Sequence, residues 1–402
     1  MILRRMAASL LVLSCCALFT SGCWNRKELN ELAIQLATSI DKEGDQYRVA
    51  SQVVIPSEVS AKTTSSGMSP VTLFQATAPT MIEAFRKMTE SSSRKIYSAH
   101  LRVLIIDEKL AKEGIAEVLD LFSRNPETRT DFYIMVAKNS PAISILETLT
   151  SMERIPAENL FYALDTSAKN WSPTTTVTIE ELIEQLVSEG LNPVLTGVQL
   201  IGNKERGKNI SNVQQVKPAA TVRFTGLAVF SGDKLAGWLD ESKSRGYNYI
   251  LDHVKSSAGH VACPSGGLIG LETLRNQTIV KADIVDGEPM ISIKITNINT
   301  IADAECRINL SDPATITELE HQAGERLQKV LEQTIAYAQE NFNFDIFGFG
   351  HKLYQTHPRQ WEKMKNEWTT KYWPNLKIKY DIKCQIHKIG TTRDSFINHL
   401  KK

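Results

Sequence analysis

The sequence predicts an α+β fold of mixed α/β character with more than one domain. Three observations support this prediction: strand and helix patterns alternate over residues 32–137, a long amphipathic helix occupies residues 317–342, and a strictly alternating strand covers residues 376–387. Alternating strands and helices favour a mixed sheet, and a single amphipathic strand needs a sheet to join. We therefore expect an N-terminal mixed-sheet α/β region and a C-terminal antiparallel sheet packed by the long amphipathic helix.

The N-terminal region is expected to open with a β-hairpin. Residues 32–41 and 46–55 have the composition of strands, and the polar turn Lys42-Glu43-Gly44-Asp45 separates them. Two such runs joined by a short turn with glycine are typical of a hairpin. Residues 56–72 are rich in Ser, Thr, Gly and Pro, which predicts an exposed loop.

A strand–helix–strand unit follows a first helix. The helix is predicted to start at Pro79 and end near Glu90, because proline is favoured in the first turn. Residues 101–106 then predict a buried strand, residues 108–122 a second helix, and residues 132–137 another buried strand. This order favours a βαβ unit with parallel pairing. The apolar face of the first helix comprises Met81, Ile82, Phe85 and Met88.

A polar stretch divides the chain. The elements before it are three predicted helices and a strand, near residues 142–150, 156–168, 178–189 and 194–201. Residues 206–220 are polar and rich in turn-forming residues, so we predict a linker there. We therefore expect an N-terminal region over residues 23–205, which could form two subdomains, a C-terminal domain over residues 221–392 and a tail over residues 393–402.

The C-terminal domain is predicted to be a sheet with one wet face and a helix on the other. Asp286-Gly287 lies between two alternating runs, residues 276–285 and 289–298, and this dipeptide is a strong signal for a tight hairpin turn. Apolar residues recur at intervals of three and four through the long helix, and Asp312-Pro313 supplies its start. The final alternating strand must join the sheet that this helix covers.

Composition excludes several classes of protein. The chain has 402 residues, with 46 Lys and Arg against 45 Asp and Glu, and its formal net charge is +1. A nucleic-acid-binding protein normally carries a basic excess, so we expect no nucleic-acid partner. Hydrophobic residues make up 42% and charged residues 23%, which excludes a disordered or low-complexity chain. An ordinary globular protein remains.

Residues 1–22 have the layout of a secretory signal peptide. Two arginines precede an uncharged apolar run over residues 6–19, and Thr20-Ser21-Gly22 lead into Cys23. The run is too short to span a bilayer, which needs about 20 helical residues. A small-residue stretch ending in cysteine resembles the lipobox of bacterial lipoproteins, whose cysteine sulfur receives a diacylglyceryl group. We therefore predict cleavage before Cys23 and lipidation of Cys23; the alternative is a plain secretory signal with an incidental cysteine.

The sequence contains none of the common catalytic or nucleotide-binding motifs. G-x-S-x-G, H-E-x-x-H, G-x-x-x-x-G-K-[ST] and C-x-x-C are absent. The glycine-rich stretch from Ser265 to Gly270 lacks the spacing of a dinucleotide-binding turn, so we interpret it as a loop. No cysteine or acidic residue completes a metal set with any histidine, so we expect no enzyme activity, metal site or cofactor. The histidines lie at positions 100, 253, 260, 321, 351, 357, 387 and 399.

Three cysteines remain after the predicted cleavage. Cys263, Cys306 and Cys384 would lie on the oxidising side of the membrane, where disulfides form. One disulfide is an option, with Cys263 and Cys306 as the pair, but we favour free thiols. Cys384 lies on the apolar side of its alternating strand, which predicts a buried thiol.

Two further segments allow both a functional and a structural interpretation. The loop Arg124-Asn125-Pro126-Glu127-Thr128-Arg129 could contact an anion or a partner, but we favour a capped turn with solvated charges. The segment WEKMKNEWTTKYW, residues 361–373, could be a helix on a membrane surface. Because a sheet strand follows at once, we expect its aromatic residues to belong to the core.

Several segments resemble one known family. The predicted mature start, CWNRKELNELAIQLATSID from residue 23, is similar to the Cys-Trp-Asp-x-x-Glu-like start of the Ger(x)C spore germination lipoproteins, with Asn25 where aspartate is usual. Residues 98–138, the segment SRGYNYI (residues 244–250) and residues 341–390 also resemble this family. The resemblance covers almost the whole chain after residue 22.

The resemblance implies a function that residue patterns alone do not. Members of this family are C subunits of nutrient germinant receptors, lipoproteins that act with integral-membrane A and B subunits in the spore inner membrane and are needed for nutrient-triggered germination. It implies a multi-domain mixed α/β fold, a lipid on Cys23 at the extracytoplasmic face of the membrane, and no catalytic residue. Trp24 and Glu28 belong to the family signature without an assigned role.

Two other functions are alternatives. An extracytoplasmic solute-binding lipoprotein of a transporter would favour two similar Rossmann-like lobes around a cleft, which the C-terminal pattern disfavours. A secreted hydrolase needs a nucleophile or a metal set that the sequence lacks. We therefore expect a lipid-anchored, non-enzymatic receptor subunit.

Overall fold

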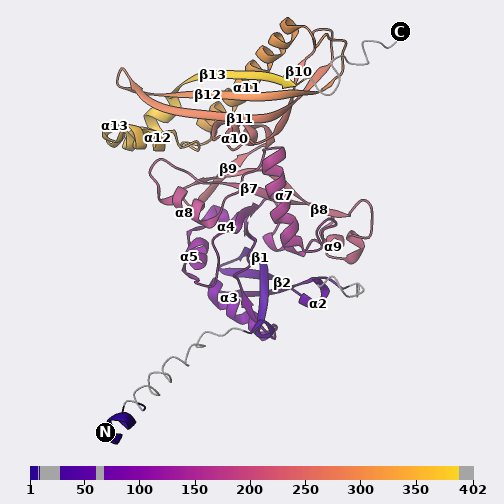
Figure 1. Cartoon of the computed structure of the whole chain (residues 1–402), viewed down its shortest axis with the longest axis vertical. Helices are drawn as coiled ribbons and strands as arrows, with labels where there is room; N and C mark the ends of the chain where they lie inside the picture. The colour runs from indigo at the N-terminus through magenta and orange to yellow at the C-terminus, as the bar shows by residue number, and fades with distance from the viewer. Residues whose placement is uncertain (8, 10–27, 60–67, 389–402) are drawn as a thin grey trace.

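Residues 1–7, 9, 28–59 and 68–388 are described by a computed structural model of the chain, and most of them fold around two β-sheets. The larger sheet has nine strands and the smaller sheet has four. Figure 1 shows an elongated molecule, with the smaller sheet at one end and the first strands of the larger sheet toward the other. The predicted α+β class, with a mixed sheet in the N-terminal region, is confirmed.

The predicted N-terminal hairpin is confirmed, and a third strand extends it. β1 (Leu32–Glu43) and β2 (Gln46–Val54) pair antiparallel. β3 (Val71–Ala78) pairs antiparallel with β2 and forms one edge of the sheet. The loop predicted over residues 56–72 was therefore drawn too long, since it starts with the short helix α2 (Pro56–Val59) and its last residues belong to β3.

Parallel strands form the centre of the larger sheet, as the strand–helix–strand order predicts. β5 (Val103–Asp107) pairs parallel with β1 on one side and with β6 (Tyr133–Ala137) on the other. The short strand β4 (Lys95–Tyr97) pairs with the start of β1. The helices that follow β6 are α6 (Ala142–Glu147), α7 (Pro156–Asn170) and α8 (Ile179–Val187).

The helix predicted over residues 108–122 is two helices. α4 (Glu108–Glu113) and α5 (Ala116–Arg124) are separated at Gly114, whose φ of 146° does not fit a helix. The backbone carbonyl and the carboxylate of Asp233 accept hydrogen bonds from the first N–H groups after this break. A contact with a distant turn therefore replaces the helical hydrogen bonds at this point.

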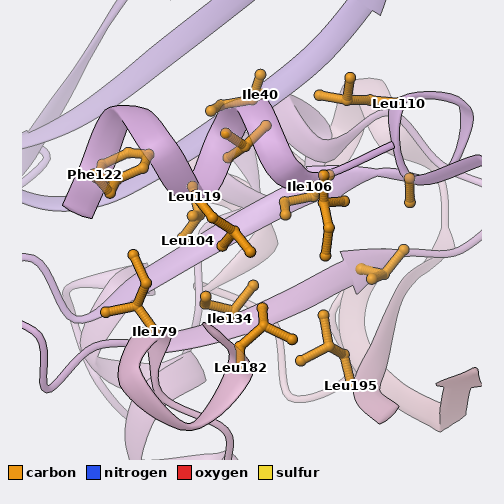
Figure 2. Packing of buried hydrophobic residues seen from close by; sticks show 14 of the residues in the cluster. Ile40, Leu104, Ile106, Leu110, Leu119, Phe122, Ile134, Ile179, Leu182 and Leu195 are labelled. Carbon is orange, nitrogen blue, oxygen red and sulfur yellow. The ribbon is translucent and has the colours of Figure 1, made fainter. Parts of the chain in front are cut away.

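Figure 2 shows the apolar core on one face of the larger sheet, where side chains of β5, α5 and α8 meet. α3 (Met81–Lys87) covers the same face and continues into η2 (Met88–Glu90). Thr80 caps α3, and the side chain of Ile82 is 50% exposed, so the predicted apolar face of this helix is wrong at Ile82. The labelled core residues include Ile40, Leu104, Ile106, Leu119, Phe122, Ile134, Ile179 and Leu182.

The larger sheet continues past the predicted linker. β7 (Val194–Gly202), β8 (Ala220–Ser231) and β9 (Lys234–Leu239) are its last strands, and β8 pairs antiparallel with both neighbours. Residues 206–220 therefore connect two paired strands of one sheet, and the chain passes to the second sheet only after β9. The division into domains at this linker stays a prediction. The connection contains α9 (Lys204–Gly207) and η3 (Ile210–Asn212).

A long hairpin dominates the smaller sheet. β11 (Leu268–Val285) and β12 (Glu288–Ala304) pair antiparallel, and their turn residues Asp286 and Gly287 have φ of 52° and 84°, as a type I′ turn requires. β10 (Ser257–Ala262) pairs with the other edge of β11. The predicted hairpin is therefore confirmed, with strands longer than expected.

The last strand corrects one expectation. β13 (Lys377–Lys388) runs parallel to β12, so the smaller sheet is mixed and not wholly antiparallel. A parallel neighbour needs a long crossover, and three helices supply it. The longest of them, α11 (Pro313–Asn341), confirms the predicted long helix and packs against β13 and β10. The others are α12 (Phe349–Thr356) and α13 (Pro358–Met364).

The aromatic segment after α12 belongs to the core, as expected. Trp361 and Trp368 are each 3% exposed and Trp373 is fully buried. The indole N–H of Trp373 donates to the carbonyl oxygen of Phe342 at 3.2 Å. The segment is built from α13 and three short helical turns, η4 (Lys365–Glu367), η5 (Trp368–Tyr372) and η6 (Trp373–Asn375).

One buried cluster joins the two sheets. It contains Leu227 and Leu239 of the larger sheet together with Ile291 and Ile293 of the smaller sheet. The helix α10 (Glu241–Ile250) lies between the sheets in sequence and supplies buried side chains to the same cluster. The sheets therefore share a core instead of being tethered by a free linker.

Candidate functional site

A hollow of about 550 Å³ lies between α10, α11 and the inner face of the smaller sheet. Its floor includes Asn297 and Asn299 of β12, and α11 forms one wall. Its rim includes Trp171, which follows α7, and Arg245 of α10. A volume of this size is in the range of sites for small molecules. We refer to this hollow as the α10–α11 pocket.

The pocket exists because polar residues interrupt an apolar row. Inward-facing positions along β12 are isoleucine at 291, 293 and 295 and again at 301, but positions 297 and 299 are asparagine. The first three isoleucines belong to the core shared by the sheets, and Ile301 belongs to a second cluster around Cys263 and Cys306. The pocket therefore lies between two apolar cores.

Hydrogen bonds determine which polar atoms of the pocket floor act as donors and which act as acceptors. Thr273 Oγ1 donates to Asn299 Oδ1 at 3.1 Å, so the hydroxyl of Tyr249, 3.3 Å from Thr273 Oγ1, must be the donor to it. Asn297 Nδ2 donates to Asn276 Oδ1 at 3.2 Å. Asn299 is only 4% exposed, and among the described residues no acceptor meets its Nδ2 group. Its two amide N–H groups are therefore available in the pocket.

Arg245 supplies a guanidinium at the rim. Its Nη2 donates to Ser257 Oγ at 2.9 Å and to the carbonyl oxygen of Ala258. The guanidinium carbon lies 4.5 Å from the ring centroid of Trp171, a cation–π contact. The Arg245 Nε atom is buried without a hydrogen-bond partner, and no ion pair joins Arg245 to the part of the chain that the structure describes.

The cysteine that lines the pocket is not an activated nucleophile. Cys384, on the floor, is a buried free thiol as expected, and burial together with the charge of Glu320 raises its pKa to about 12. The thiol is therefore protonated at neutral pH and is a poor nucleophile. Within the described ranges, no group of three His, Cys, Asp or Glu side chains could hold a metal ion.

Two buried aspartates lie outside the pocket and cap backbone N–H groups. Asp41 accepts hydrogen bonds from Ala142 and Ile143 at 2.7 and 3.0 Å, and burial together with the neighbouring Asp107 raises its pKa to about 6. Asp345 is 1% exposed and burial raises its pKa to about 6. These carboxylates have structural partners, so we do not assign them to a site.

The predicted lipidation site, Cys23, lies outside the described residues, as does Trp24. Glu28 lies where the described body begins and is half-buried. Among the histidines that the structure describes, His260 lines the α10–α11 pocket, Nδ1 of His351 lies 2.9 Å from the carbonyl oxygen of Glu189, and His357 contacts its neighbour Thr356. His399 lies outside the described residues.

The loop over residues 124–129 has the structure of a turn with paired charges. Arg124 forms an ion pair with Asp120, and Arg129 with Asp131, both within 2.8 Å. Glu127 pairs with Lys95 at 2.9 Å. The structure therefore matches the interpretation that we favoured for this loop.

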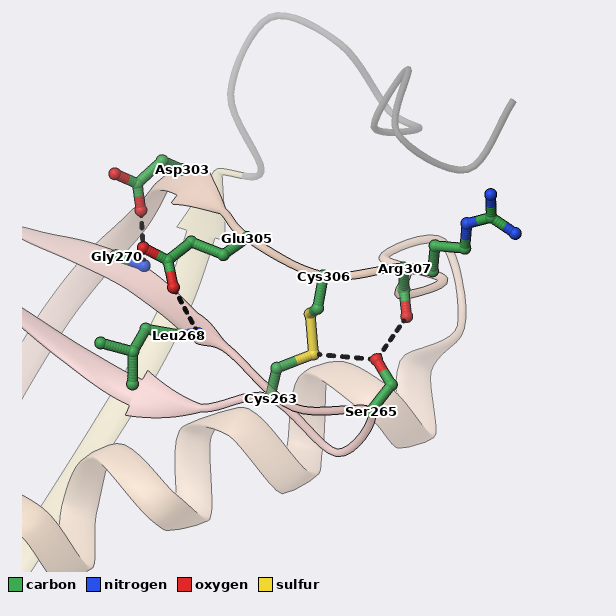
Figure 3. Close-up of a disulfide and its surroundings, with 8 residues drawn as sticks. All are labelled: Cys263, Ser265, Leu268, Gly270, Asp303, Glu305, Cys306 and Arg307. Atoms are coloured by element: carbon green, nitrogen blue, oxygen red, sulfur yellow. Dashed lines mark hydrogen bonds between the residues drawn. A yellow bond between two sulfur atoms is a disulfide. The ribbon is translucent and has the colours of Figure 1, made fainter. Parts of the chain in front are cut away.

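Cys263 and Cys306 form a disulfide, the option that we had not favoured (Figure 3). It joins the segment after β10 to the segment after β12, where Ser265 Oγ donates to the carbonyl oxygen of Arg307 at 3.1 Å. The glycine-rich stretch is thus a loop only as far as Gly267, and the expectation of a loop is wrong for residues 268–270, which belong to β11. A bridge with a sequence separation of 43 stabilises a fold by about 4 kcal/mol in the chain-entropy model.

Sequence reasoning missed the helix that carries much of the pocket. α10 has buried Ser244, Gly246 and Asn248 on its inner side, so it lacks the apolar periodicity that identifies a helix. Asn248 Nδ2 donates to the carbonyl oxygens of Ser172 and Thr174 at 2.8 and 3.0 Å. The available signal was Asp240, whose side chain caps α10 by accepting the N–H of Lys243.

Two family models match the chain in tandem. The model described as "Spore germination protein N-terminal domain" matches residues 25–200, and the model "Spore germination B3/ GerAC like, C-terminal" matches residues 225–390. Together they cover both sheets. Within the ranges that the structure describes, no helix is both long and apolar enough to cross a membrane.

Relatives align over nearly the full length of the chain. Spore germination protein KC of Bacillus subtilis (strain 168) is 29% identical over 406 residues, which cover 99% of each chain. Spore germination protein B3 of the same organism is 24% identical over 375 residues, which cover 92% of this chain and 94% of the relative. These relatives are named as germination proteins and not as enzymes.

A solved structure has the same fold. The crystal structure of the GerBC protein matches with a TM-score of 0.55 and 18% identity, over 87% of this chain and 96% of that chain. The tandem family matches and the full-length relatives agree with this likeness, and we conclude that the chain belongs to the Ger(x)C family of spore germination proteins.

Proposed function

We propose that the chain is a lipid-anchored, non-enzymatic subunit of a germinant receptor in the spore inner membrane. In this role it is attached through a lipid on Cys23 and contacts integral-membrane A and B subunits. The observation that carries the proposal is the match of both family models, which together account for the two sheets. A role in spore germination follows from this membership, and the attachment and the partners are the proposed part.

The first 23 residues support the proposed attachment. They combine a short apolar run with a small-residue stretch and a cysteine, a pattern that resembles the lipobox. Two or more acyl chains hold a protein firmly on a bilayer, since each buried methylene contributes about 0.8 kcal/mol.

The fold supports a defined orientation on that anchor. Leu29, where η1 (Leu29–Glu31) begins, is six positions after Cys23 in the sequence. Even fully extended, such a segment spans only about 20 Å. η1 leads directly into β1, and β1 and β2 lie at the end of the molecule away from the smaller sheet (Figure 1). The proposed anchor therefore places the N-terminal strands nearest the membrane and the smaller sheet farthest from it.

The disulfide supports an extracytoplasmic location. Disulfides persist in oxidising compartments and are rare in the cytosol. The bridge between Cys263 and Cys306 is buried, with its two residues 6% and 5% exposed, so it belongs to the folded core of the smaller sheet.

The proposed attachment is tested by replacing the cysteine. We expect Cys23→Ala to move the protein from the membrane fraction of spores to the soluble fraction and to impair nutrient-triggered germination. Cys16→Ala is the matched control, because Cys16 lies in the apolar run that cleavage removes. Unchanged membrane fractionation of the Cys23→Ala protein contradicts the anchoring proposal.

The alternative, a solute-binding lipoprotein of a transporter, finds less support in the fold. That class would favour two similar lobes around a cleft, whereas this chain has a nine-stranded mixed sheet and a four-stranded sheet that share a core. The α10–α11 pocket lies between α10, α11 and the smaller sheet, with Trp171 after α7 at its rim, and not between two equivalent lobes.

A further inference from the structure

We propose that the α10–α11 pocket binds a small organic carboxylate with an apolar body and a second oxygen acceptor. This inference goes beyond the receptor-subunit proposal and does not depend on it, since it concerns binding to the isolated chain. It rests on the hydrogen-bond donors of the pocket, on their missing acceptors and on the apolar wall beside them.

The free polar groups of the pocket are mainly donors. Arg245 has five N–H groups, and only its Nη2 has acceptors among the described residues. Asn299 offers both Nδ2 hydrogens, because its Oδ1 already accepts from Thr273. Arg326 of α11 lines the mouth, and no hydrogen bond or ion pair joins it to the described part of the chain. A ligand that satisfies these groups must be rich in acceptors and negatively charged.

Two acceptor atoms of the pocket already have partners. Glu241 Oε1, at the rim, accepts the indole N–H of Trp171 at 3.2 Å. Asn297 Oδ1 faces the thiol of Cys384 at 4.0 Å. The lining carries two guanidinium groups, those of Arg245 and Arg326, against the single carboxylate of Glu241, and this balance favours an oxyanion over a cation.

An apolar wall distinguishes an organic anion from an inorganic one. Leu327 and Val330 of α11 line the pocket, and Leu271 of β11 lies on the opposite side, 6% exposed. Inorganic phosphate would leave this wall in contact with water, whereas a short aliphatic body would cover it. We infer that the carboxylate lies at Arg245, the second oxygen at Asn299, and the aliphatic body against α11.

The buried asparagine is itself an argument for a ligand. Asn299 lies on the inward face of β12 between Asn297 and Ile301, where it lines the hollow, and no described residue accepts a hydrogen bond from its Nδ2 group. An apolar residue there would join the two apolar cores that lie on either side of it. We therefore infer that the amide of Asn299 serves to bind a ligand and not to pack the core.

The test is calorimetric titration of the purified full-length chain in non-ionic detergent. The probes are 2-hydroxyisocaproate and 2-oxoisocaproate, which combine a carboxylate, a second oxygen and an aliphatic body. Inorganic phosphate supplies charge without the body, and isocaproamide supplies the body without the charge. We expect saturable binding of at least one of the two acids, and weak or no binding of phosphate and isocaproamide.

Isosteric variants locate the binding. Asn299→Asp keeps the acceptor for Thr273 but replaces the donor with a carboxylate oxygen that repels the ligand, so we expect binding at least about tenfold weaker. Arg245→Gln should weaken binding of the acid by a similar factor. Arg275→Gln is the matched control, because Arg275 is exposed on the outer face of β11, and it should bind as the native chain does.

A surface variant distinguishes a loss of binding from a loss of folding. Arg326 is exposed and bonded to none of the described residues, so Arg326→Gln should retain the thermal unfolding temperature while weakening binding by a smaller factor. Three results overturn the proposal: no saturable heat with either acid, binding of phosphate alone, or native affinity in folded Asn299→Asp and Arg245→Gln.

Discussion

One buried carboxylate, that of Asp345, stabilises a turn at the contact between the two sheets. Asp345 lies before α12, and its carboxylate accepts the backbone N–H groups of Phe347 and Gly350, each at 2.8 Å. Its own backbone carbonyl accepts from Asn192 Nδ2 at 2.9 Å, in the loop before β7. One buried aspartate thus organises the turn into α12 and, through its backbone, contacts the larger sheet.

The buried carboxyl of Asp345 makes stability depend on pH. Burial raises its pKa to about 6, against about 3.9 in an unfolded chain. The folded state therefore binds the proton more tightly, so the contribution of Asp345 to the free energy of unfolding is full below about pH 4 and is lost as the pH rises through about 6. Measured by urea unfolding, this contribution should fall by up to about 2–3 kcal/mol across that window.

The Asp345→Asn variant isolates this effect. We expect its free energy of unfolding to change less between about pH 4 and pH 6.5 than that of the native chain. Asp283→Asn, on the exposed outer face of β11, is the matched control and should retain the native pH profile. Identical profiles for native and Asp345→Asn proteins contradict the assignment.

At the level of elements, the close approach of α10 and α11 builds the pocket wall. A Cβ atom on Gly246 of α10 would lie 2.0 Å from Thr334 Oγ1 of α11. Thr334 is 1% exposed and its hydroxyl donates to the carbonyl oxygen of Val330 at 2.7 Å, so it cannot move aside freely. Only glycine allows the two helices to meet at this distance.

We therefore predict that Gly246→Ala lowers the free energy of unfolding by roughly 1–3 kcal/mol, although alanine favours a helix by about 1 kcal/mol. Gly324→Ala on α11 is the matched control, since its added Cβ would meet only an ordinary contact at 3.7 Å, and it should be neutral or stabilising. Thr334→Ala combined with Gly246→Ala should recover part of the loss in a double-mutant cycle. Equal stabilities of the two glycine variants in urea unfolding contradict this packing.

Elements with strong periodicity were predictable, and elements defined by distant contacts were not. The hairpin turn at Asp286-Gly287 and the long helix α11 follow from local chemistry, so the sequence predicted both. The break at Gly114 depends on Asp233, more than 100 residues away, which no local pattern reveals. The parallel direction of β13 likewise depends on the crossover helices and not on its own alternation.

The candidate site was the least predictable part. α10 packs through glycine, serine and asparagine, so its buried side does not look apolar in the sequence. Asn297 and Asn299 take inward positions of β12 that continue the row of Ile291, Ile293 and Ile295, and this placement emerges only once β12 is paired with β11. Cys23 was identified from the leader and from the family resemblance, and no contact of the described residues bears on it.

For the whole molecule, the shared core gives the proposed receptor subunit a fixed shape. The loop after α8 contacts the crossover helices, where Glu189 Oε2 accepts the indole N–H of Trp361 at 2.8 Å. The larger and the smaller sheet are therefore joined by direct packing, and a short anchor at Cys23 would fix which end is near the membrane. Under this account, α3 lies within reach of membrane-embedded partners.

The most direct test of the central claim is photo-crosslinking in intact spores from a single position on α3. Ile82 is suitable because it is 50% exposed, and Ile279 on the outer face of β11 is a comparison position at the far end that is 44% exposed. We predict that a photoreactive residue at Ile82 captures integral-membrane receptor subunits, identified by mass spectrometry, and does so more strongly than one at Ile279. Capture of no integral-membrane protein from either position contradicts the claim that this chain is a membrane receptor subunit.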